Sequence, residues 1–421
     1  MNLVALSVPI FLFLIAIEFV AGLLRQRKVY AFSDFVTNIS CGIGQQVLGA
    51  FFAILTFAAY RFIYDEWRIF TIPDTWYYAL LLFIGVDFFY YWFHRLSHEI
   101  NAIWATHIVH HQSEEYNLSV ALRQSWFQTC FSWVFYIPLS FLGFSPVLMV
   151  IIVALNTLYQ FWIHTKLIRN MGPFEWIFNT PSHHRVHHGS NPKYIDKNHA
   201  GTLIIWDRMF GTFQKEEEEV VYGITVPLRS WNPFHANFHY WQELAAHASK
   251  ARGMDKIRMF LKSPGWFPAD QGGVKHAPEV NAASFKKFGI EVLPRIQWYV
   301  FLQFLFTIGA VTYYMFFAND WILGDNFSNL AQCAGLAAFI LLTIFSLGAL
   351  LENRGYGWPV EMLRLVAGMA LILLFSDEAW FSGMLLFYPL MQVTLLAYVF
   401  IPSFLRTQTQ THKTTAKTAA P

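Results

Sequence analysis

Charged residues are scarce in this sequence. Only 13% of its 421 residues are Asp, Glu, Lys or Arg, whereas soluble globular proteins carry about 25%. Hydrophobic residues make up 55% of the chain. This balance excludes an ordinary soluble protein and indicates an integral membrane protein, long enough for several spans and one soluble region. The net charge of +2 gives no reason to expect a nucleic-acid partner.

Cysteine and the common cofactor-binding signatures are also missing. Cys41, Cys130 and Cys333 form no CxxC pair, which argues against a disulfide framework or a zinc finger. No GxGxxG turn follows a predicted strand, and no GxxxxGK[ST] loop or His-Pro-Gly-Gly haem motif is present. A redox enzyme with this sequence would therefore take its electrons from a small external reductant or from a separate redox protein.

Long apolar runs predict nine transmembrane helices, because about 20 apolar residues are needed to cross a bilayer as a helix. Lys and Arg concentrate at 25–28, 166–292 and 403–417. The positive-inside rule therefore predicts a cytoplasmic C-terminus and places 94–124 and 166–292 on the cytoplasmic side. The predicted spans cover residues 3–24, 36–61, 75–93, 125–141, 145–165, 293–317, 329–351, 360–375 and 379–402.

These spans predict an all-α polytopic membrane protein with four parts. The fourth and fifth spans are short, and they can form a hairpin that crosses the membrane only in part. Glu18, inside the first span, has no role that the sequence explains. The four parts are N-terminal transmembrane helices (1–74), a core with a cytoplasmic histidine-rich cap (75–292), extra C-terminal transmembrane helices (293–402) and a disordered tail (403–421).

Eight of the sixteen histidines fall into three spaced clusters. Residues at i, i+3 and i+4 share one helical face, so each cluster can aim two or three imidazoles at one point. The clusters are HxxxH at His94 and His98, HxxHH at His107, His110 and His111, and a second HxxHH at His184, His187 and His188, with His183 just before it.

Three such clusters predict a metal site with two metal ions. Imidazole binds iron, zinc and copper well, and eight or more imidazoles exceed what one metal needs. Zinc has no redox chemistry, so an oxidising site would use two iron ions, which zinc could replace in purified protein. The alternative without a metal is a run of solvated histidines at the membrane interface. A metal transporter or sensor would instead carry its histidines at mid-span depth.

Two residues outside the spaced clusters are candidates for supporting roles. His164 lies alone at the predicted cytoplasmic end of the fifth span, where it could complete the ligand set or serve as an interfacial anchor. Asp87 shares a helical stripe with His94. A buried carboxylate there could accept the free N–H of a ligand imidazole, or it could make a structural contact between helices.

The histidine pattern resembles that of the fatty acid hydroxylase superfamily, also called the sterol desaturase family. The segments "DFFYYWFHRLSHE", "HHQSEEYNLSVALRQS", "PSHHRVHHGSN" and "WDRMFGTF" are similar to its alkylglycerol monooxygenase branch, as are the extra C-terminal spans. The resemblance covers residues 75–270 strongly. It implies a membrane-bound, O2-dependent di-iron monooxygenase of lipids, with tetrahydrobiopterin or another external reductant as electron donor.

Three further residues enter as candidates at this site. The resemblance makes Glu99 a candidate catalytic residue, although its position next to His98 directs it about 100° away on a helix. Asn117 and Arg123 follow the first HxxHH near the predicted head-group level. Arg123 could bind a phosphate or another polar head group, or it could close a structural ion pair.

The reaction that this reading predicts is hydroxylation of an unactivated C–H bond. In the alkylglycerol branch that carbon lies beside the ether oxygen, and the hemiacetal breaks to an aldehyde and a glycerol derivative. The alternative within the superfamily is a hydroxylase or desaturase of an acyl chain, sterol, carotenoid or aminolipid. The protein would contribute lipid positioning and exclusion of water.

Overall fold

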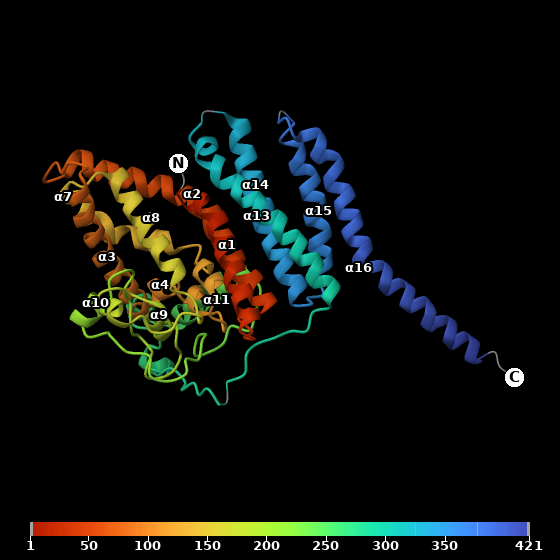
Figure 1. The fold of residues 1–421 in the computed structure, drawn as a ribbon, viewed down its shortest axis with the longest axis horizontal. Coiled ribbons are helices and arrows are strands. Elements are labelled where there is room, and N and C mark those ends of the chain that lie inside the picture. Colours follow the sequence, from red (N-terminus) through yellow and green to blue (C-terminus); the bar gives the residue numbers. More distant parts are fainter. Residues whose placement is uncertain (1–2, 284, 325, 377, 419–421) are drawn as a thin grey trace. The chain divides into compact units, whose positions relative to one another are not determined.

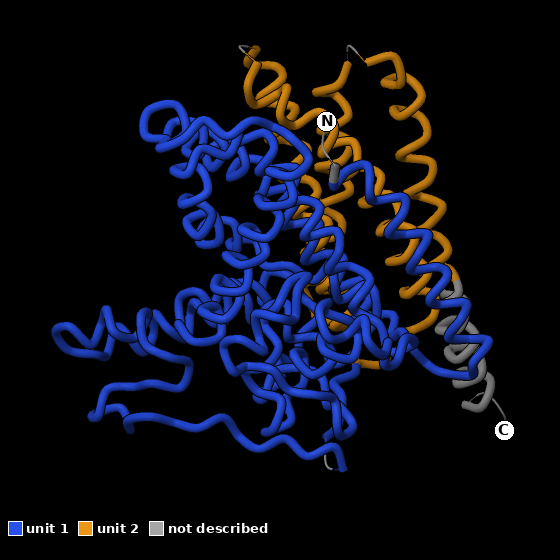
Figure 2. The backbone as a smooth tube through the Cα atoms, turned by 60° about the vertical axis from the view of Figure 1, so that its left-hand side comes forward, with its two compact units in different colours: residues 1–289 blue, residues 290–421 orange. Residues whose placement is uncertain are grey.

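The computed structural model describes residues 3–283, 285–324, 326–376 and 378–418. In these ranges the regular structure is helical, and only two isolated bridges occur, which pair Phe178 with Leu203 and Gly189 with Tyr222. The all-α prediction is therefore confirmed. The chain forms two compact units, Met1–Gly289 and Ile290–Pro421, which Figure 2 distinguishes by colour. The division falls close to residue 293, where the sequence predicts the C-terminal spans to begin.

The first unit contains three helices of membrane-spanning length and composition. They are α1 (Leu3–Leu24), α2 (Phe32–Trp67) and α3 (Trp76–Glu99). Large apolar side chains along them, such as Phe13, Leu55 and Leu80, are exposed. Helices that are apolar on their outward faces suit contact with lipid chains.

The predicted fourth and fifth spans do not form two full transmembrane helices. Residues 125–141 divide into α6 (Gln128–Ser132), the 3-10 helix η2 (Trp133–Tyr136) and α7 (Ile137–Leu142). Pro138 lies in the first turn of α7, where its missing N–H is tolerated, but it cannot continue a helix from η2. Gly143, with φ of 104°, ends α7. The chain then reverses into α8 (Pro146–Trp162), an apolar helix of only 17 residues.

Short helices form the cap at the ends of α3 and α8 (Figure 1). Asn117 caps η1 by accepting from the Ser119 N–H, and Asn232 caps α11 in the same way from Phe234 and His235. The helices of this region are α4 (Asn101–Trp104), α5 (Ile108–His111), η1 (Leu118–Leu122), η3 (Gly172–Trp176), α9 (Pro181–His187), α10 (Ile205–Met209), α11 (Pro233–Lys250), α12 (Asp255–Leu261) and η4 (Ala269–Gln271).

The second unit is a set of four helices, α13 (Pro294–Leu323), α14 (Phe327–Leu351), α15 (Gly357–Leu373) and α16 (Phe381–Thr418). Three of them reach membrane-spanning length and composition, and α15 falls short because it has 17 residues and carries Glu361 and Arg364. The described chain thus offers six candidate spans rather than the nine predicted.

Helix α16 also covers most of the tail that the sequence predicts to be disordered. Its backbone stays helical through Thr418, and no Gly or Pro between residues 403 and 418 interrupts it. Residues 419–421 of the predicted tail lie outside the described residues.

Candidate metal centre

Nine histidines converge in two adjacent groups inside the first unit. Within each group, one ligand-capable nitrogen from every histidine lies within 4.8 Å of the others, and all nine side chains are buried. The first histidine group contains His94, His98, His107, His111 and His187. The second histidine group contains His110, His164, His184 and His188.

Each HxxHH motif contributes to both groups. His107 and His111, four residues apart, enter the first group, whereas His110 between them enters the second. Adjacent residues on a helix point about 100° apart, while residues at i and i+4 share a face. The single turn α5 therefore divides its imidazoles between two centres.

The second motif repeats this division with the groups exchanged. His184 and His188 enter the second group, and His187 enters the first. The sequence predicts the participating residues, but it does not show that each cluster serves two centres. The two motifs thus link the two groups through α5 and α9.

Backbone carbonyls fix how several of the rings are oriented. The Nδ1 atoms of four histidines lie within hydrogen-bonding distance of backbone carbonyls, to which a protonated Nδ1 donates. This tautomer leaves the lone pair on Nε2. The pairs are His94 with His199 (2.7 Å), His110 with Arg123 (3.0 Å), His164 with Gln160 (2.8 Å) and His187 with Lys197 (2.9 Å).

The second group tests directly whether these residues suit a metal ion. His110 and His164 both use Nδ1 to donate, so both Nε2 atoms carry lone pairs, and these atoms lie only 3.2 Å apart. The Nε2 atoms of His164 and His184 are 3.0 Å apart. Two acceptors at such a distance repel one another unless a cation lies among them. These lone-pair nitrogens therefore form a set of ligands that fits a metal ion.

The first group shows the same feature. The Nε2 of His107 lies 2.9 Å from that of His94 and 3.1 Å from that of His111. The Nε2 atoms of His98 and His187 are buried and have no hydrogen-bond partner among the described residues. Unpaired buried nitrogens are costly, and coordination to a metal would satisfy them.

Burial keeps the cap imidazoles in the neutral form that binds metal. Removal from water lowers the pKa of His110 to about 4. Burial, reinforced by neighbouring imidazoles, also holds the pKa values of His107, His184 and His188 well below the ordinary histidine value. Near neutral pH these rings are therefore uncharged, and each keeps one lone pair that can bind a metal.

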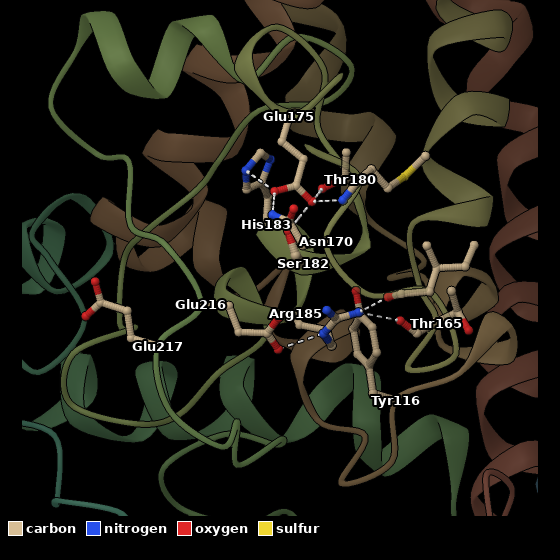
Figure 3. Close-up of polar contacts among 12 residues, drawn as sticks. Tyr116, Thr165, Asn170, Glu175, Thr180, Ser182, His183, Arg185, Glu216 and Glu217 are labelled. Atoms are coloured by element: carbon tan, nitrogen blue, oxygen red, sulfur yellow. Dashed lines mark hydrogen bonds and ion pairs between the residues drawn. The ribbon is translucent and has the colours of Figure 1, made fainter. Parts of the chain in front are cut away.

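His183 does not join either group, in contrast to the prediction. Its Nε2 lies 3.8 Å from the Glu175 carboxylate (Figure 3), because the neighbouring His184 occupies the helix face that is directed at the second group. Glu175 also accepts hydrogen bonds from Thr180 and Ser182 at the start of α9. Burial lowers the pKa of His183 to about 4. This pair therefore supports the first turn of α9.

Asp87 is buried but does not contact a ligand imidazole, so the expected direct hydrogen bond is not formed. Its carboxylate accepts from the backbone N–H groups of Thr202 (2.7 Å) and Leu203 (3.0 Å). Gly201 permits this approach, because a Cβ there would lie 2.9 Å from an Asp87 oxygen. The ordered loop presents the His199 carbonyl to His94. Asp87 is thus connected to the first group through the backbone of this loop.

Glu99 points away from the histidines. Its carboxylate forms an ion pair with Arg95, one turn earlier on α3, at 2.9 Å, and its side chain is 46% exposed. The geometry of α3 explains this position, since a residue next to His98 faces another side of the helix. The structure therefore does not place Glu99 with the grouped imidazoles.

Arg123 and Asn117 are structural residues rather than exposed head-group contacts. Arg123 is 2% exposed, and it donates to the carbonyl of Val109 (2.7 Å) and to the side chains of Asn38 (3.0 Å) and Gln112 (2.8 Å). Its own carbonyl accepts from His110. Asn117 donates to the Val29 carbonyl and caps η1. Full burial with satisfied donors leaves neither residue free for a phosphate.

The sequence pattern did not single out two residues that support segments around the histidine groups. The Asp207 carboxylate accepts from the N–H groups of His199 and Ala200, and burial raises the pKa of Asp207 to about 6. Arg185, inside the second HxxHH, donates to both carboxylate oxygens of Glu216 at 2.7 Å (Figure 3). The position of Arg185 between clustered histidines indicated a place near the site. The sequence could not identify its partner Glu216, which lies 31 residues away.

Known proteins resemble the chain across the region that holds both groups. Residues 79–212 match the fatty acid hydroxylase family. Alkylglycerol monooxygenases of Danio rerio and Homo sapiens are each 40% identical to the chain, over 87% and 85% of its length and 81% and 80% of theirs. An ornithine lipid hydroxylase of Rhizobium tropici is 31% identical over 34% of this chain and 44% of its own. No solved structure matches the chain.

Proposed function

The chain belongs to the alkylglycerol monooxygenase branch of the fatty acid hydroxylase family, and on this premise we propose that it cleaves the ether bond of alkylglycerol lipids. It is a multi-pass membrane monooxygenase that acts on a lipid with O2. We further propose that it uses two iron ions as cofactor and takes electrons from a tetrahydropterin or another external reductant. Its active site would face the cytoplasm.

One observation carries the metal part of this proposal. His110 and His164 direct two lone-pair nitrogens at one another at 3.2 Å, and a second group of five histidines lies beside theirs. Two groups with separate donors support two metal ions rather than one. Imidazole donors suit iron, and iron supplies the activation of O2 that zinc cannot.

The chain's own residues would hold the metals and keep water away. The nine grouped imidazoles are buried. Backbone carbonyls orient four of them, and these carbonyls lie on α8, directly after η1 and in the loop that follows α9. A fixed donor geometry in a water-poor site protects the oxidant and lowers reorganisation during reaction.

The proposed reaction balances as a monooxygenation. One oxygen atom of O2 enters the C–H bond beside the ether oxygen, and the other leaves as water with two electrons and two protons from the external reductant. The hemiacetal then loses its C–O bond to the glycerol, which gives a fatty aldehyde and a free glycerol hydroxyl. No redox cofactor within the chain is required for this balance.

The cytoplasmic orientation rests on charge. Arg25, Arg27 and Lys28 follow the first span, and the cap segment 166–292 is rich in Lys and Arg. Lys and Arg close to the ends of spans favour the cytoplasmic side of the membrane. The cap carries most of the grouped histidines, so this rule directs the metal centre toward the cytoplasm.

A second candidate within the same chemistry is hydroxylation of an aminolipid. It is supported by the partial similarity to the ornithine lipid hydroxylase. That similarity covers about a third of the chain, so it supports the shared core rather than the substrate. The longer similarity to alkylglycerol monooxygenases favours ether cleavage.

The direct test is a lipid assay with purified protein in detergent or nanodiscs. Iron-loaded protein, O2 and tetrahydropterin should convert a 1-O-alkylglycerol into fatty aldehyde and glycerol, detected by mass spectrometry. The ester-linked 1-acylglycerol is the matched control, and it should give no aldehyde. A hydroxylated ornithine lipid with no ether cleavage would favour the second candidate, and no oxidised product from either lipid would contradict the proposal.

A further inference from the structure

A carboxylate in the first span has no explanation in the activity proposed above. Glu18 belongs to α1 and is only 4% exposed. Ionisable residues within membrane helices are costly and are usually retained for a function. The partners of Glu18 show where that function lies.

Three donors from separate parts of the chain converge on Glu18. The Thr165 hydroxyl donates to one carboxylate oxygen at 2.5 Å. The Leu118 backbone N–H donates to the other at 2.8 Å, and that oxygen also accepts from the Tyr30 hydroxyl. An ionised carboxylate accepts only, so this set of donors suits it.

Thr165 connects Glu18 to one ligand segment and then to another. It directly follows His164, a member of the second histidine group. Its carbonyl accepts from the Arg185 guanidinium at 3.0 Å, and Arg185 lies on α9 next to His184 (Figure 3). The hydrogen bonds of Glu18 therefore reach both the His164 segment and the helix that supplies His184 and His188.

Leu118 connects Glu18 to the remaining member of the group. It is the first residue of η1, which ends at Leu122. The next residue, Arg123, presents the carbonyl that accepts from His110 Nδ1. All four members of the second histidine group thus lie on segments that are joined to Glu18 by short chains of hydrogen bonds.

We propose that Glu18 is a positioning residue for the second histidine group and hence for one of two metal ions. This inference rests on the metal centre of the proposed function. Asp87 has the corresponding place beneath the first group, because it orders the loop whose carbonyl orients His94. Each group is then supported by its own carboxylate from a membrane helix, Glu18 on α1 and Asp87 on α3.

Apolar packing offers the competing explanation. Ile15, one turn before Glu18, is buried in a cluster with Leu118 and Phe161. If α1 acted only as a packing surface, loss of this contact would disturb the second group as much as loss of the carboxylate. Ile15→Ala is therefore the matched control, since it removes apolar contact on the same face and no hydrogen bond.

The experiment measures bound metal after challenge with a chelator, using full-length protein loaded with iron or zinc. Glu18→Leu should lower the metal affinity of one site by about 10–100-fold, the usual effect of losing a group that orients a ligand. It should retain about one ion while the wild type retains about two. Thr165→Val should behave similarly, Glu18→Gln should be milder, and Ile15→Ala should keep both ions.

Double variants identify which site is affected. In a His107→Ala/His111→Ala background, where only the second group remains, Glu18→Leu should remove the remaining ion. In a His184→Ala/His188→Ala background, where only the first group remains, it should change nothing. Equal losses in both backgrounds, or retention of both ions by folded Glu18→Leu, would overturn this inference.

The wild type separates this inference from the proposed function. If wild-type protein bound no metal, the proposed function itself would fail. If the wild type bound two ions and Glu18→Leu also bound two, only the role of Glu18 would fail. Size-exclusion profiles of each variant establish that metal loss occurs in folded protein.

Discussion

The second ring nitrogen of each ligand histidine matters as much as the nitrogen that faces the metal. In His110 and His164 the Nδ1 atoms donate to the carbonyls of Arg123 and Gln160. Without these bonds either ring could rotate or change tautomer, and it would no longer offer Nε2. The carbonyl acceptor that each histidine meets with Nδ1 therefore determines whether its Nε2 is free to bind a metal.

The substitution Asp87→Asn tests, at the first group, whether a fixed ring orientation is needed for metal binding. The amide keeps the shape of the side chain, but its NH2 would face donors, among them the N–H groups of Thr202 and Leu203. The loop should loosen and His94 should lose its fixed orientation. We expect a decrease of about 10–100-fold in metal affinity or activity, measured by metal analysis and product formation.

The control for Asp87→Asn is Ser140→Ala. Ser140 is also buried, but its hydroxyl has no hydrogen-bond partner among the described residues, so its removal should leave metal and activity intact. Wild-type metal content and activity in Asp87→Asn would show that the loop holds its shape without this carboxylate.

The grouped histidines were more predictable from sequence than the residues that contact them. Spacing identified eight of the nine grouped histidines, because i, i+3 and i+4 positions share a helical face, and the ninth, His164, was proposed from its place at the end of a predicted span. The prediction also included His183, since a row of adjacent histidines does not show which one faces inward. Spacing could not show that Arg123 is enclosed by Asn38 and Gln112, because these contacts depend on how the chain folds and Asn38 lies 85 residues away.

At the scale of helices, short elements determine the site and long ones support it. Helices α5 and α9 have four and seven residues, yet together with their flanking residues they supply six of the nine grouped histidines. Short helices gain little stability on their own. Their positions must come from contacts such as Arg185 with Glu216 and Glu175 with Ser182.

Hydropathy predicted the long spans well and the broken ones poorly. Helices α1, α2 and α3 correspond closely to predicted spans. Residues 125–141 carry no charged side chain, but a change to 3-10 geometry at Trp133 and Pro138 at the next helix start interrupt them. A hydropathy window averages composition, so it cannot detect a break in the backbone hydrogen bonds.

The four helices of the second unit offer a test of their own. Glu361 and Arg364 form a fully buried ion pair on α15, and Glu361 also accepts from the hydroxyls of Tyr299 on α13 and Ser346 on α14. Glu361→Leu leaves a buried, unpaired arginine. We expect a loss of about 3–5 kcal/mol in the free energy of unfolding, measured by denaturation in detergent.

The double variant Glu361→Leu/Arg364→Leu supplies the control for this pair. It removes both charges, and replacing a buried ion pair with apolar residues is often nearly neutral. It should therefore be more stable than Glu361→Leu alone. Equal or greater destabilisation in the double variant would contradict the role assigned to the unpaired arginine.

At the scale of the whole molecule, the proposed orientation makes the cap accessible only from the cytoplasm. A cysteine placed at the exposed Lys256 position of α12 should resist a membrane-impermeant thiol reagent in intact cells and react after permeabilisation. The matched control is the same substitution at the exposed Asp74, in the loop before α3, which should react in intact cells. Labelling of the cysteine at residue 256 in intact cells would contradict the proposed orientation.

The central claim is that nine buried histidines hold two metal ions in two separable groups, and metal analysis tests it most directly. Wild-type protein supplied with iron should contain about two metal ions per chain, because each metal takes about four to six ligands. His107→Ala/His111→Ala and His184→Ala/His188→Ala should each retain about one ion, and both should lose oxidation of the lipid. His235→Ala/His239→Ala, outside both groups, should keep two ions and full activity. A wild type that binds one ion or none, or group variants that keep two, would contradict the account.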